Sequence, residues 1–200
     1  MNSNKNSLFE IEESRVCGID EAGRGPIAGP LVVAGVVLKS SIKGLKDSKK
    51  LSQKRREELF EKIKADGIYH IVVIESQRLD ALGLSKSINF ALKDIKNRFS
   101  YLNIEIIFDG NSSFGVTGIR TIVKADEKIP EVSAASILAK VTRDRIMLKY
   151  AKEFPNYGFE RHKGYCTKKH LDAILKFGLC RVHRRSFKIP INYPEKTLFD

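Results

Sequence analysis

Residues 16–38 limit the possible folds of this chain more than any other stretch. Two short apolar runs, rich in valine and isoleucine, flank a turn that contains glycine and proline. Runs of this length and composition are typical of strands rather than helices. The first run leads into two adjacent carboxylates, Asp20 and Glu21. Because hard divalent cations prefer oxygen ligands, this pair is a candidate metal site, although an isolated acidic dipeptide is usually a solvated part of a hairpin turn.

The turn also contains a pattern that formally fits a dinucleotide-binding loop. Gly23, Gly25 and Ala28 have the required spacing. Such a loop needs a helix that begins directly after the glycines, so that the helix N-terminus binds the pyrophosphate. Pro26 and Pro30 lead into a strand-like run instead. We therefore predict no nucleotide cofactor.

The composition favours a polyanionic partner. The chain has 200 residues and a formal net charge of +12, which suits nucleic acid but does not by itself separate DNA from RNA or from an acidic membrane. No apolar run approaches the ~20 residues of a membrane span, and the N-terminus lacks the apolar centre of a signal peptide. Three cysteines without C-x-x-C spacing are typical of reduced thiols. We expect a cytoplasmic protein that does not bind a membrane.

The apolar periodicity predicts one α/β domain across residues 1–200, with tails at about 1–13 and 190–200. Strands are predicted at 16–19, 31–38, 69–75, 104–108 and 118–123, and helices at 52–65, 82–99, 130–153 and between Thr167 and Gly178. Antiparallel hairpins followed by crossover connections imply a mixed central sheet flanked by helices. The C-terminal region is expected to be helical.

Carboxylates follow three separate predicted strands. They are Asp20 with Glu21, then Asp109, then Asp126. Sites tend to form where strand ends meet, so these acids could converge. Crowded carboxylates repel one another unless a cation neutralises them, and a site without histidine or cysteine ligands favours Mg²⁺ or Mn²⁺. Taken singly, however, Asp109 is typical of a turn and Asp126 of an exposed loop.

The string from Gly18 to Pro26, with residues 28–30 after it, resembles the N-terminal signature of bacterial ribonuclease HII, the type 2 ribonuclease H family. Further matching blocks extend to about residue 188. The resemblance implies a ribonuclease H-like fold and hydrolysis of RNA in RNA–DNA hybrids. It also implies nicking of duplex DNA on the 5′ side of single embedded ribonucleotides, which leaves 3′-hydroxyl and 5′-phosphate ends. The implied cofactors are two divalent ions, Mn²⁺ or Mg²⁺.

The same resemblance implies roles for individual residues. Asp20, Glu21, Asp109 and Asp126 would be the catalytic metal ligands, although Ala125 occupies a position where many bacterial members have glycine. Gly23, Arg24, Gly25, Ser48, Lys49, Tyr165 and Arg184 would contact nucleic acid, with the Gly-Arg-Gly loop reading the ribose and Tyr165 packing on the next deoxynucleotide. Arg143 and Asp144 also match the family pattern, but they could form a structural ion pair within a helix. The run Lys54-Arg55-Arg56 is more simply a solvated helix face.

Two other interpretations are compatible with parts of the sequence. A resolvase-like or transposase-like nuclease of the same fold would share the acids but lack both the Gly-Arg-Gly loop and Tyr165. A non-catalytic basic nucleic-acid-binding protein would explain the charge but not the strand-terminal acids. The ribonuclease HIII class is disfavoured by the Gly-Arg-Gly loop. Residues 196–199 faintly resemble a sliding-clamp-binding tail, but so short a match often arises by chance, and a disordered end is the simpler interpretation. A monomer is expected by default.

Overall fold

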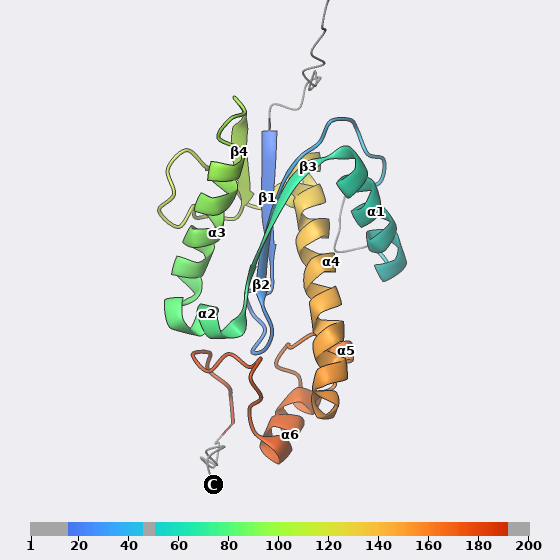
Figure 1. The fold of residues 1–200 in the computed structure, drawn as a ribbon, viewed down its shortest axis with the longest axis vertical. Helices are drawn as coiled ribbons and strands as arrows, with labels where there is room; N and C mark the ends of the chain where they lie inside the picture. The colour runs from blue at the N-terminus through green and yellow to red at the C-terminus, as the bar shows by residue number, and fades with distance from the viewer. Residues whose placement is uncertain (1–15, 46–50, 192–200) are drawn as a thin grey trace, which may run out of the picture.

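A single five-stranded sheet forms the centre of the computed structural model, which describes residues 16–45 and 51–191 (Figure 1). Its strands are β1 (Val16–Ala22), β2 (Leu31–Val37), β3 (Ile68–Ile74), β4 (Glu105–Asp109) and β5 (Arg120–Ile122). They are arranged in the order β3-β2-β1-β4-β5. The pairs β1–β2 and β2–β3 are antiparallel, whereas β1–β4 and β4–β5 are parallel. The predicted mixed sheet is therefore confirmed.

Helices cover both faces of this sheet. They are α1 (Gln53–Asp66), α2 (Ser76–Leu82), α3 (Leu84–Arg98), α4 (Pro130–Glu153), α5 (Phe159–His162) and α6 (Lys168–Phe177), with short 3₁₀ turns η1 (Ala125–Glu127) and η2 (Pro155–Tyr157). In Figure 1, α2 and α3 lie on one side of the sheet, α1 and α4 lie on the other, and α5 and α6 extend one end of the molecule. The helical C-terminal region is as predicted.

The alternation of side chains along the central strands produces two cores. Ile19 and Val33 point toward α3, where they pack with residues such as Leu92. Val32 and Ala34 point to the other face and pack against α1 and α4. A third apolar cluster joins the end of α4 to η2, α5 and α6. Successive residues of a strand face opposite sides, so Asp20, which follows Ile19, faces α4.

Three predicted elements differ in extent from the structure. The predicted helix at 82–99 is α3, which begins at Leu84 because Gly83, with φ of 78°, interrupts the helical backbone, and the preceding helix α2 was not predicted. The first strand continues to Ala22, so both carboxylates lie within it. The last strand is shorter than predicted and covers only Arg120–Ile122. Among the described residues, no helix combines the length and apolar character that crossing a bilayer requires.

Helix α4 crosses directly over β1 because Gly18 has no side chain. A Cβ at Gly18 would lie 2.2 Å from the backbone carbon of Glu131 and 2.2 Å from the backbone nitrogen of Val132. A glycine permits this close approach of strand and helix backbones. The contact places the first turns of α4 beside the end of β1 that carries Asp20.

Candidate active site

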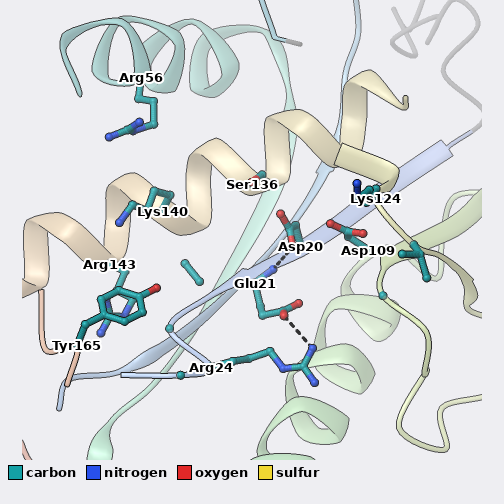
Figure 2. Close-up of a pocket in the computed structure, with 15 residues that line it drawn as sticks. Asp20, Glu21, Arg24, Arg56, Asp109, Lys124, Ser136, Lys140, Arg143 and Tyr165 are labelled. Carbon is teal, nitrogen blue, oxygen red and sulfur yellow. Dashed lines mark hydrogen bonds and ion pairs between the residues drawn. The ribbon is translucent and has the colours of Figure 1, made fainter. Parts of the chain in front are cut away.

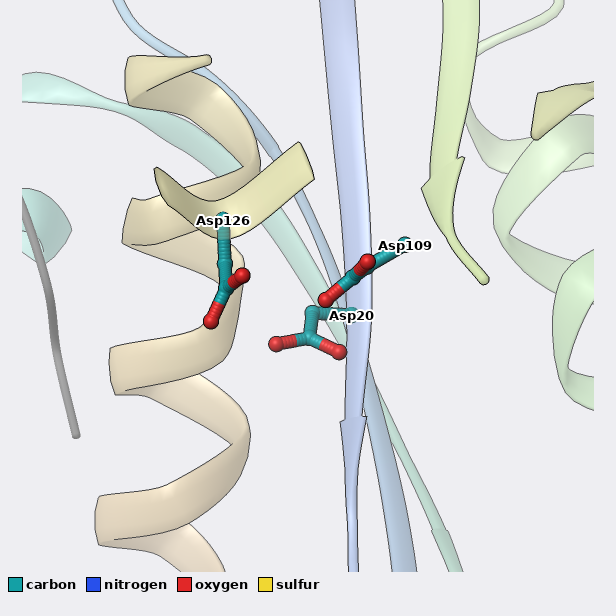
Figure 3. A group of neighbouring side chains, drawn as sticks. All are labelled: Asp20, Asp109 and Asp126. Carbon is teal, nitrogen blue, oxygen red and sulfur yellow. The ribbon is translucent and has the colours of Figure 1, made fainter. Parts of the chain in front are cut away.

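Three aspartates that are distant in sequence meet at one edge of the fold. Asp20 lies on β1, Asp109 is the last residue of β4, and Asp126 lies on η1. One carboxylate oxygen from each lies within 4.8 Å of the others. Figure 3 shows the three carboxylates pointing toward a common centre. The predicted convergence of these acids is therefore seen in the structure.

Strand register explains why the first two aspartates meet. Strands β1 and β4 are parallel, and Ile19 is paired with Phe108. The next residue of each strand is an aspartate, so Asp20 and Asp109 occupy adjacent positions across the ladder. Parallel pairing thus fixes the separation of their backbones.

The third aspartate lies on a 3₁₀ turn rather than at a strand end, because β5 stops at Ile122. The backbone N–H of Ala125 donates to Oδ1 of Asp109 at 3.1 Å, which ties this turn to β4. Lys124 takes the left-handed conformation, with φ of 56°, but Ala125 itself has a helical backbone and a fully buried methyl group. Alanine therefore fits the position at which many family members have glycine.

Glu21 faces the same region but is separate from the three-aspartate cluster. Its Oε1 accepts a hydrogen bond from the Arg24 guanidinium at 3.3 Å, whereas its Oε2 is buried without a hydrogen-bond partner among the described residues. The backbone N–H of Glu21 donates to Oδ1 of Asp20 at 2.7 Å. A buried carboxylate oxygen without a donor is costly unless a cation or ligand occupies the space beside it.

The electrostatics of this acidic group are unfavourable for the protein alone. Burial raises the pKa of Asp20 well above its ordinary value, and the negative charges of Glu21 and Asp109 raise it further. Burial also raises the pKa of Glu21, although Arg24 opposes that shift. Both effects arise because like charges are held together away from water. A divalent cation would reverse this penalty, and an all-oxygen donor set fits a hard ion such as Mg²⁺ or Mn²⁺.

A cleft of about 770 Å³ opens over these carboxylates (Figure 2). One wall carries Asp20, Glu21 and Asp109, and the glycine-rich loop at 23–25 forms the adjacent rim. Tyr165, from the loop between α5 and α6, borders the same cleft, with 48% of its surface exposed. Three of the four predicted metal ligands and the predicted ribose-reading residues thus line one cavity. Asp126 does not line it, although its carboxylate approaches those of Asp20 and Asp109.

Four basic residues outside the predicted set of nucleic-acid contacts also line the cleft: Arg56 from α1, Lys124 before η1, and Lys140 and Arg143 from α4. In Figure 2, Arg56, Lys140 and Arg143 lie on one side of the carboxylates and Lys124 lies on the other. Residues 136, 140 and 143 of the predicted helix are four and three positions apart, which places them on one helix face. That spacing was the available signal for the α4 residues. Arg56, in contrast, could not be distinguished from its solvated neighbours.

The two glycines of the loop have different surroundings. At Gly23, φ is +100°, and a Cβ would lie 2.4 Å from Nε of Arg143 and 2.6 Å from the carbonyl oxygen of Pro30. At Gly25 a Cβ would meet nothing within 4 Å. Gly23 is therefore required by the fold, whereas Gly25 leaves open space at the rim of the cleft.

Arg184, predicted to contact nucleic acid, is instead a structural residue. Its side chain is fully buried; its Nε donates to the carbonyl of Gly29 at 2.8 Å, and Nη1 donates to the carbonyl of Arg24 at 3.3 Å. A guanidinium enclosed in this way does not reach a phosphate. The prediction of direct contact is wrong, and the residue holds the glycine-rich loop from behind.

Arg143 has a similar supporting position. Its guanidinium donates to the carbonyls of Pro30, Ala28 and Lys163, so it joins the glycine-rich loop to the loop that carries Tyr165. The hydrogen-bonded partner of Asp144 is Lys140, at 2.9 Å. The alternative of an Arg143–Asp144 ion pair is thus replaced by an arginine that binds backbone carbonyls. Ser48 and Lys49 lie outside the described residues, and so do residues 196–199.

Comparison with known proteins gives a consistent result. The family model of ribonuclease HII matches residues 17–189. Ribonuclease HII of Sulfurovum sp. (strain NBC37-1) is 55% identical over 191 residues, which cover 96% of this chain and 100% of that protein. The match therefore spans the acidic cluster, the glycine-rich loop and Tyr165 together.

Solved structures support the same relationship. The ribonuclease HII in the PCNA:RNase HII complex from Archaeoglobus fulgidus aligns with a TM-score of 0.76 and 31% identity, covering 92% of this chain and 98% of that one. Bst-RNase HIII in complex with Mn²⁺ aligns with a TM-score of 0.58 over 76% of this chain and 60% of its own, and at 18% identity it shows the shared fold alone. The fold is ribonuclease H-like, and the chain belongs to the ribonuclease HII family, type 2 ribonucleases H that hydrolyse phosphodiester bonds.

Proposed function

We propose that this ribonuclease H nicks duplex DNA on the 5′ side of single embedded ribonucleotides, as well as hydrolysing the RNA strand of RNA–DNA hybrids. The products would carry 3′-hydroxyl and 5′-phosphate ends. One observation carries the proposal: Asp20, Glu21 and Asp109 line the same cleft as the Gly-Arg-Gly loop and Tyr165, and the carboxylate of Asp126 approaches those of Asp20 and Asp109. A site that combines hydrolysis with recognition of one sugar needs both kinds of residue around the same phosphodiester.

The proposed ligands of the divalent ions are Asp20, Glu21, Asp109 and Asp126. This proposal is supported by the close approach of three carboxylates, and by the buried Oε2 of Glu21, which has no hydrogen-bond partner in the part of the chain that the structure describes. Two bound ions, Mg²⁺ or Mn²⁺, would activate the attacking water and stabilise the charge on the departing oxygen. The protein's own part is to hold the four carboxylates in place through the β1–β4 register and the η1 turn.

The residues at the rim would select the substrate. The 2′-hydroxyl distinguishes RNA from DNA at a single nucleotide, and the open space at Gly25 lets the backbone of the loop approach that group. The exposed ring of Tyr165 offers a flat surface for the neighbouring sugar or base. Arg56 and Lys140 add positive charge along the cleft, which suits the phosphates of the same strand.

Further aspects of this function remain predictions. We expect one domain and one protomer to be sufficient for activity. A sliding-clamp contact through residues 196–199 is suggested by the Archaeoglobus fulgidus complex with PCNA, which contains a ribonuclease HII. We also expect a cytoplasmic location.

The substrate-selecting role is tested by comparing two arginine variants. Arg24→Ala removes a rim residue whose side chain is 44% exposed and bonded to Glu21. Arg98→Ala removes an exposed arginine at the end of α3 that does not line the cleft. We expect Arg24→Ala to lower kcat/KM on a duplex with one ribonucleotide by about 10-fold or more, and Arg98→Ala to leave it nearly unchanged. Equal effects would contradict a role of the loop in reading the junction.

A further inference from the structure

Three of the four histidines of the chain gather beside the loop that carries Tyr165. The ring of His162 stacks on that of His170, with centroids 4.3 Å apart, and His170 lies 5.2 Å from His183. His170 and His183 are almost completely buried. Phe159 makes aromatic contacts with all three rings. These histidines are not part of the cleft and have no place in the proposed hydrolysis.

Hydrogen bonds connect two of these histidines into a directed chain. Nδ1 of His170 lies 2.9 Å from the carbonyl oxygen of Tyr165, and its Nε2 lies 3.0 Å from Nε2 of His183. At the other end, the backbone N–H of Cys180 donates to Nδ1 of His183 at 3.0 Å. The chain therefore runs from the Cys180 backbone, through both imidazoles, to the backbone of Tyr165.

The hydrogen-bond partners at the two ends of this chain, the Tyr165 carbonyl and the Cys180 N–H, are consistent with a single tautomer of each histidine. A carbonyl can only accept, so Nδ1 of His170 carries the proton, and in the neutral ring its Nε2 must accept. His183 must then donate from Nε2, which leaves its Nδ1 free to accept from Cys180. The Cys180 carbonyl, 3.3 Å from that Nδ1, already accepts the backbone N–H of His183. The Cys180 thiol, whose Sγ lies 3.1 Å from the same Nδ1, can also donate to it. One arrangement of protons is therefore compatible with all of these contacts.

The third histidine supports the same loop from the adjacent turn. Nε2 of His162 donates to the carbonyl of Tyr157 at 2.8 Å, and its Nδ1 accepts the N–H of Gly164 at 3.2 Å. Burial lowers the pKa of all three histidines, to about 4 for His170 and about 3 for His183. Neutral rings are what the chain requires, because a second proton on either His170 or His183 would place two donors face to face.

The hydrogen-bonded chain ends at the carbonyl of Tyr165, and the backbone at this position controls the direction of the Tyr165 side chain. The Tyr165 carbonyl accepts from the Thr167 N–H as well as from His170, and the Tyr165 N–H donates to the His162 carbonyl. Both neighbouring peptide groups are therefore fixed. The ring projects into the cleft, where the Arg143 guanidinium lies 5.9 Å from its centroid (Figure 2).

We propose that His170 and His183 are positioning residues for Tyr165, acting through this hydrogen-bonded chain on the selection of the ribonucleotide junction. The proposal rests on the proposed role of Tyr165 as a substrate contact. An aromatic ring that stacks on a sugar or base is useful only in one orientation, and a buried chain without alternative tautomers holds its backbone rigidly. Solvent cannot replace the lost bond, because the rings are enclosed.

Nuclear magnetic resonance tests the tautomers of the hydrogen-bonded histidines independently of activity. Long-range ¹H–¹⁵N correlation spectra of the wild-type protein near pH 7.5 distinguish protonated from unprotonated ring nitrogens. We expect the proton on Nδ1 of His170 and on Nε2 of His183 and His162. A proton on Nε2 of His170, or a charged ring, would overturn the proposal.

Two substitutions of His170 test its effect on the selection of the ribonucleotide junction. His170→Asn places an amide N–H near the position of Nδ1, whereas His170→Phe keeps the ring volume without a donor. The readout is the ratio of kcat/KM on a single-ribonucleotide duplex to kcat/KM on a long RNA–DNA hybrid. We expect His170→Phe to lower this ratio about 10-fold and His170→Asn to restore most of it. His70→Phe is the matched control, since His70 bonds Asp94 on the surface of β3 and α3.

A double variant that combines His170→Phe with Tyr165→Ala separates the positioning role of His170 from the proposed role of Tyr165 as a substrate contact. If Tyr165→Ala lowers the ratio and His170→Phe adds nothing in the double variant, the histidine acts through the tyrosine. If Tyr165→Ala lowers the ratio but the folded His170→Phe protein does not, the positioning role alone is overturned. An unchanged ratio in Tyr165→Ala would instead remove the junction role of the tyrosine, and the positioning role with it.

Discussion

Gly23 and Gly25 flank Arg24 in the sequence but have different roles in the fold. We expect Gly23→Ala to destabilise the protein by roughly 1–3 kcal/mol or more, because its φ is positive and its Cβ would meet Arg143. Gly25→Ala should change the free energy of unfolding by less than about 0.5 kcal/mol. It should nevertheless lower kcat/KM on a single-ribonucleotide duplex roughly 10- to 100-fold, because a methyl group would hold the sugar away from the loop.

Thermal unfolding and cleavage of the two variants, measured together, check this difference. Full activity of Gly25→Ala would show that the open space at this position does not receive the substrate. Full stability of Gly23→Ala would show that the contact with Arg143 is less restrictive than the structure indicates.

We expect Asp20 to destabilise the metal-free protein and to be necessary for cleavage of the phosphodiester. Because Asp20 is buried beside other carboxylates, we expect Asp20→Asn to raise the melting temperature of the metal-free protein. The same substitution should lower cleavage at least about 100-fold and leave binding of an RNA–DNA hybrid largely intact. Added Mn²⁺ should stabilise the wild type more than the variant.

Calorimetry with and without Mn²⁺, together with a binding assay, would check these effects of Asp20→Asn. A fall in melting temperature together with lost binding would indicate a structural role for Asp20 instead of a metal-binding one.

Individual site residues differed in how far the sequence could predict them. Asp20, Glu21 and Asp109 follow from strand endings and the resemblance, and the structure brings them to one cleft. Arg184 was misjudged because an arginine in a basic motif is normally exposed, and only the tertiary contacts reveal its burial. The sequence does not single out Arg56, because its neighbours are also basic and no local pattern indicates which of these side chains points toward the cleft.

At the scale of elements, the contact between β1 and α4 determines the position of the acidic cluster. Gly18→Ala should destabilise the protein by roughly 1–3 kcal/mol, because its Cβ would lie 2.2 Å from the α4 backbone. The displacement should also reduce cleavage, since β1 carries Asp20. Gly25→Ala is the control for the added methyl group, and denaturant unfolding is the measurement. Equal stability of the two variants would contradict the close approach.

Element boundaries were less predictable than the elements themselves. The apolar repeat from residue 82 to 99 predicts α3, which covers Leu84–Arg98, but α2 at Ser76–Leu82 is too short to show a helical repeat of its own. Asp126 was expected near a strand end and lies on a 3₁₀ turn instead. Its position depends on a bond between Ala125 and Asp109, a long-range contact that no local pattern encodes.

At the scale of the whole molecule, the buried histidines should make stability depend on pH. In the unfolded chain a histidine binds a proton near pH 6.5, but in the fold burial lowers the pKa to about 4 for His170 and about 3 for His183. Between these values the unfolded state holds more protons, so stability falls as the pH decreases below about 6.5. The slope is at most about 1.4 kcal/mol per pH unit for each histidine.

Denaturant unfolding at pH 7.5 and pH 5.0 measures this effect. His170→Asn should lose less stability over this range than the wild type, because one proton-binding group is absent. His70→Asn, on the sheet surface, is the control. Equal losses in the wild type and His170→Asn would contradict neutral burial of His170.

The central claim is that one cleft joins metal-dependent hydrolysis to recognition of a single ribose. The most direct measurement is cleavage of duplex DNA that contains one ribonucleotide, with Mg²⁺ or Mn²⁺ and with a chelator, beside all-DNA and all-RNA duplexes. We predict a metal-dependent nick on the 5′ side of the ribonucleotide, a 3′-hydroxyl end, and intact controls. Cleavage of long hybrids without any nick at the single ribonucleotide would contradict the claim.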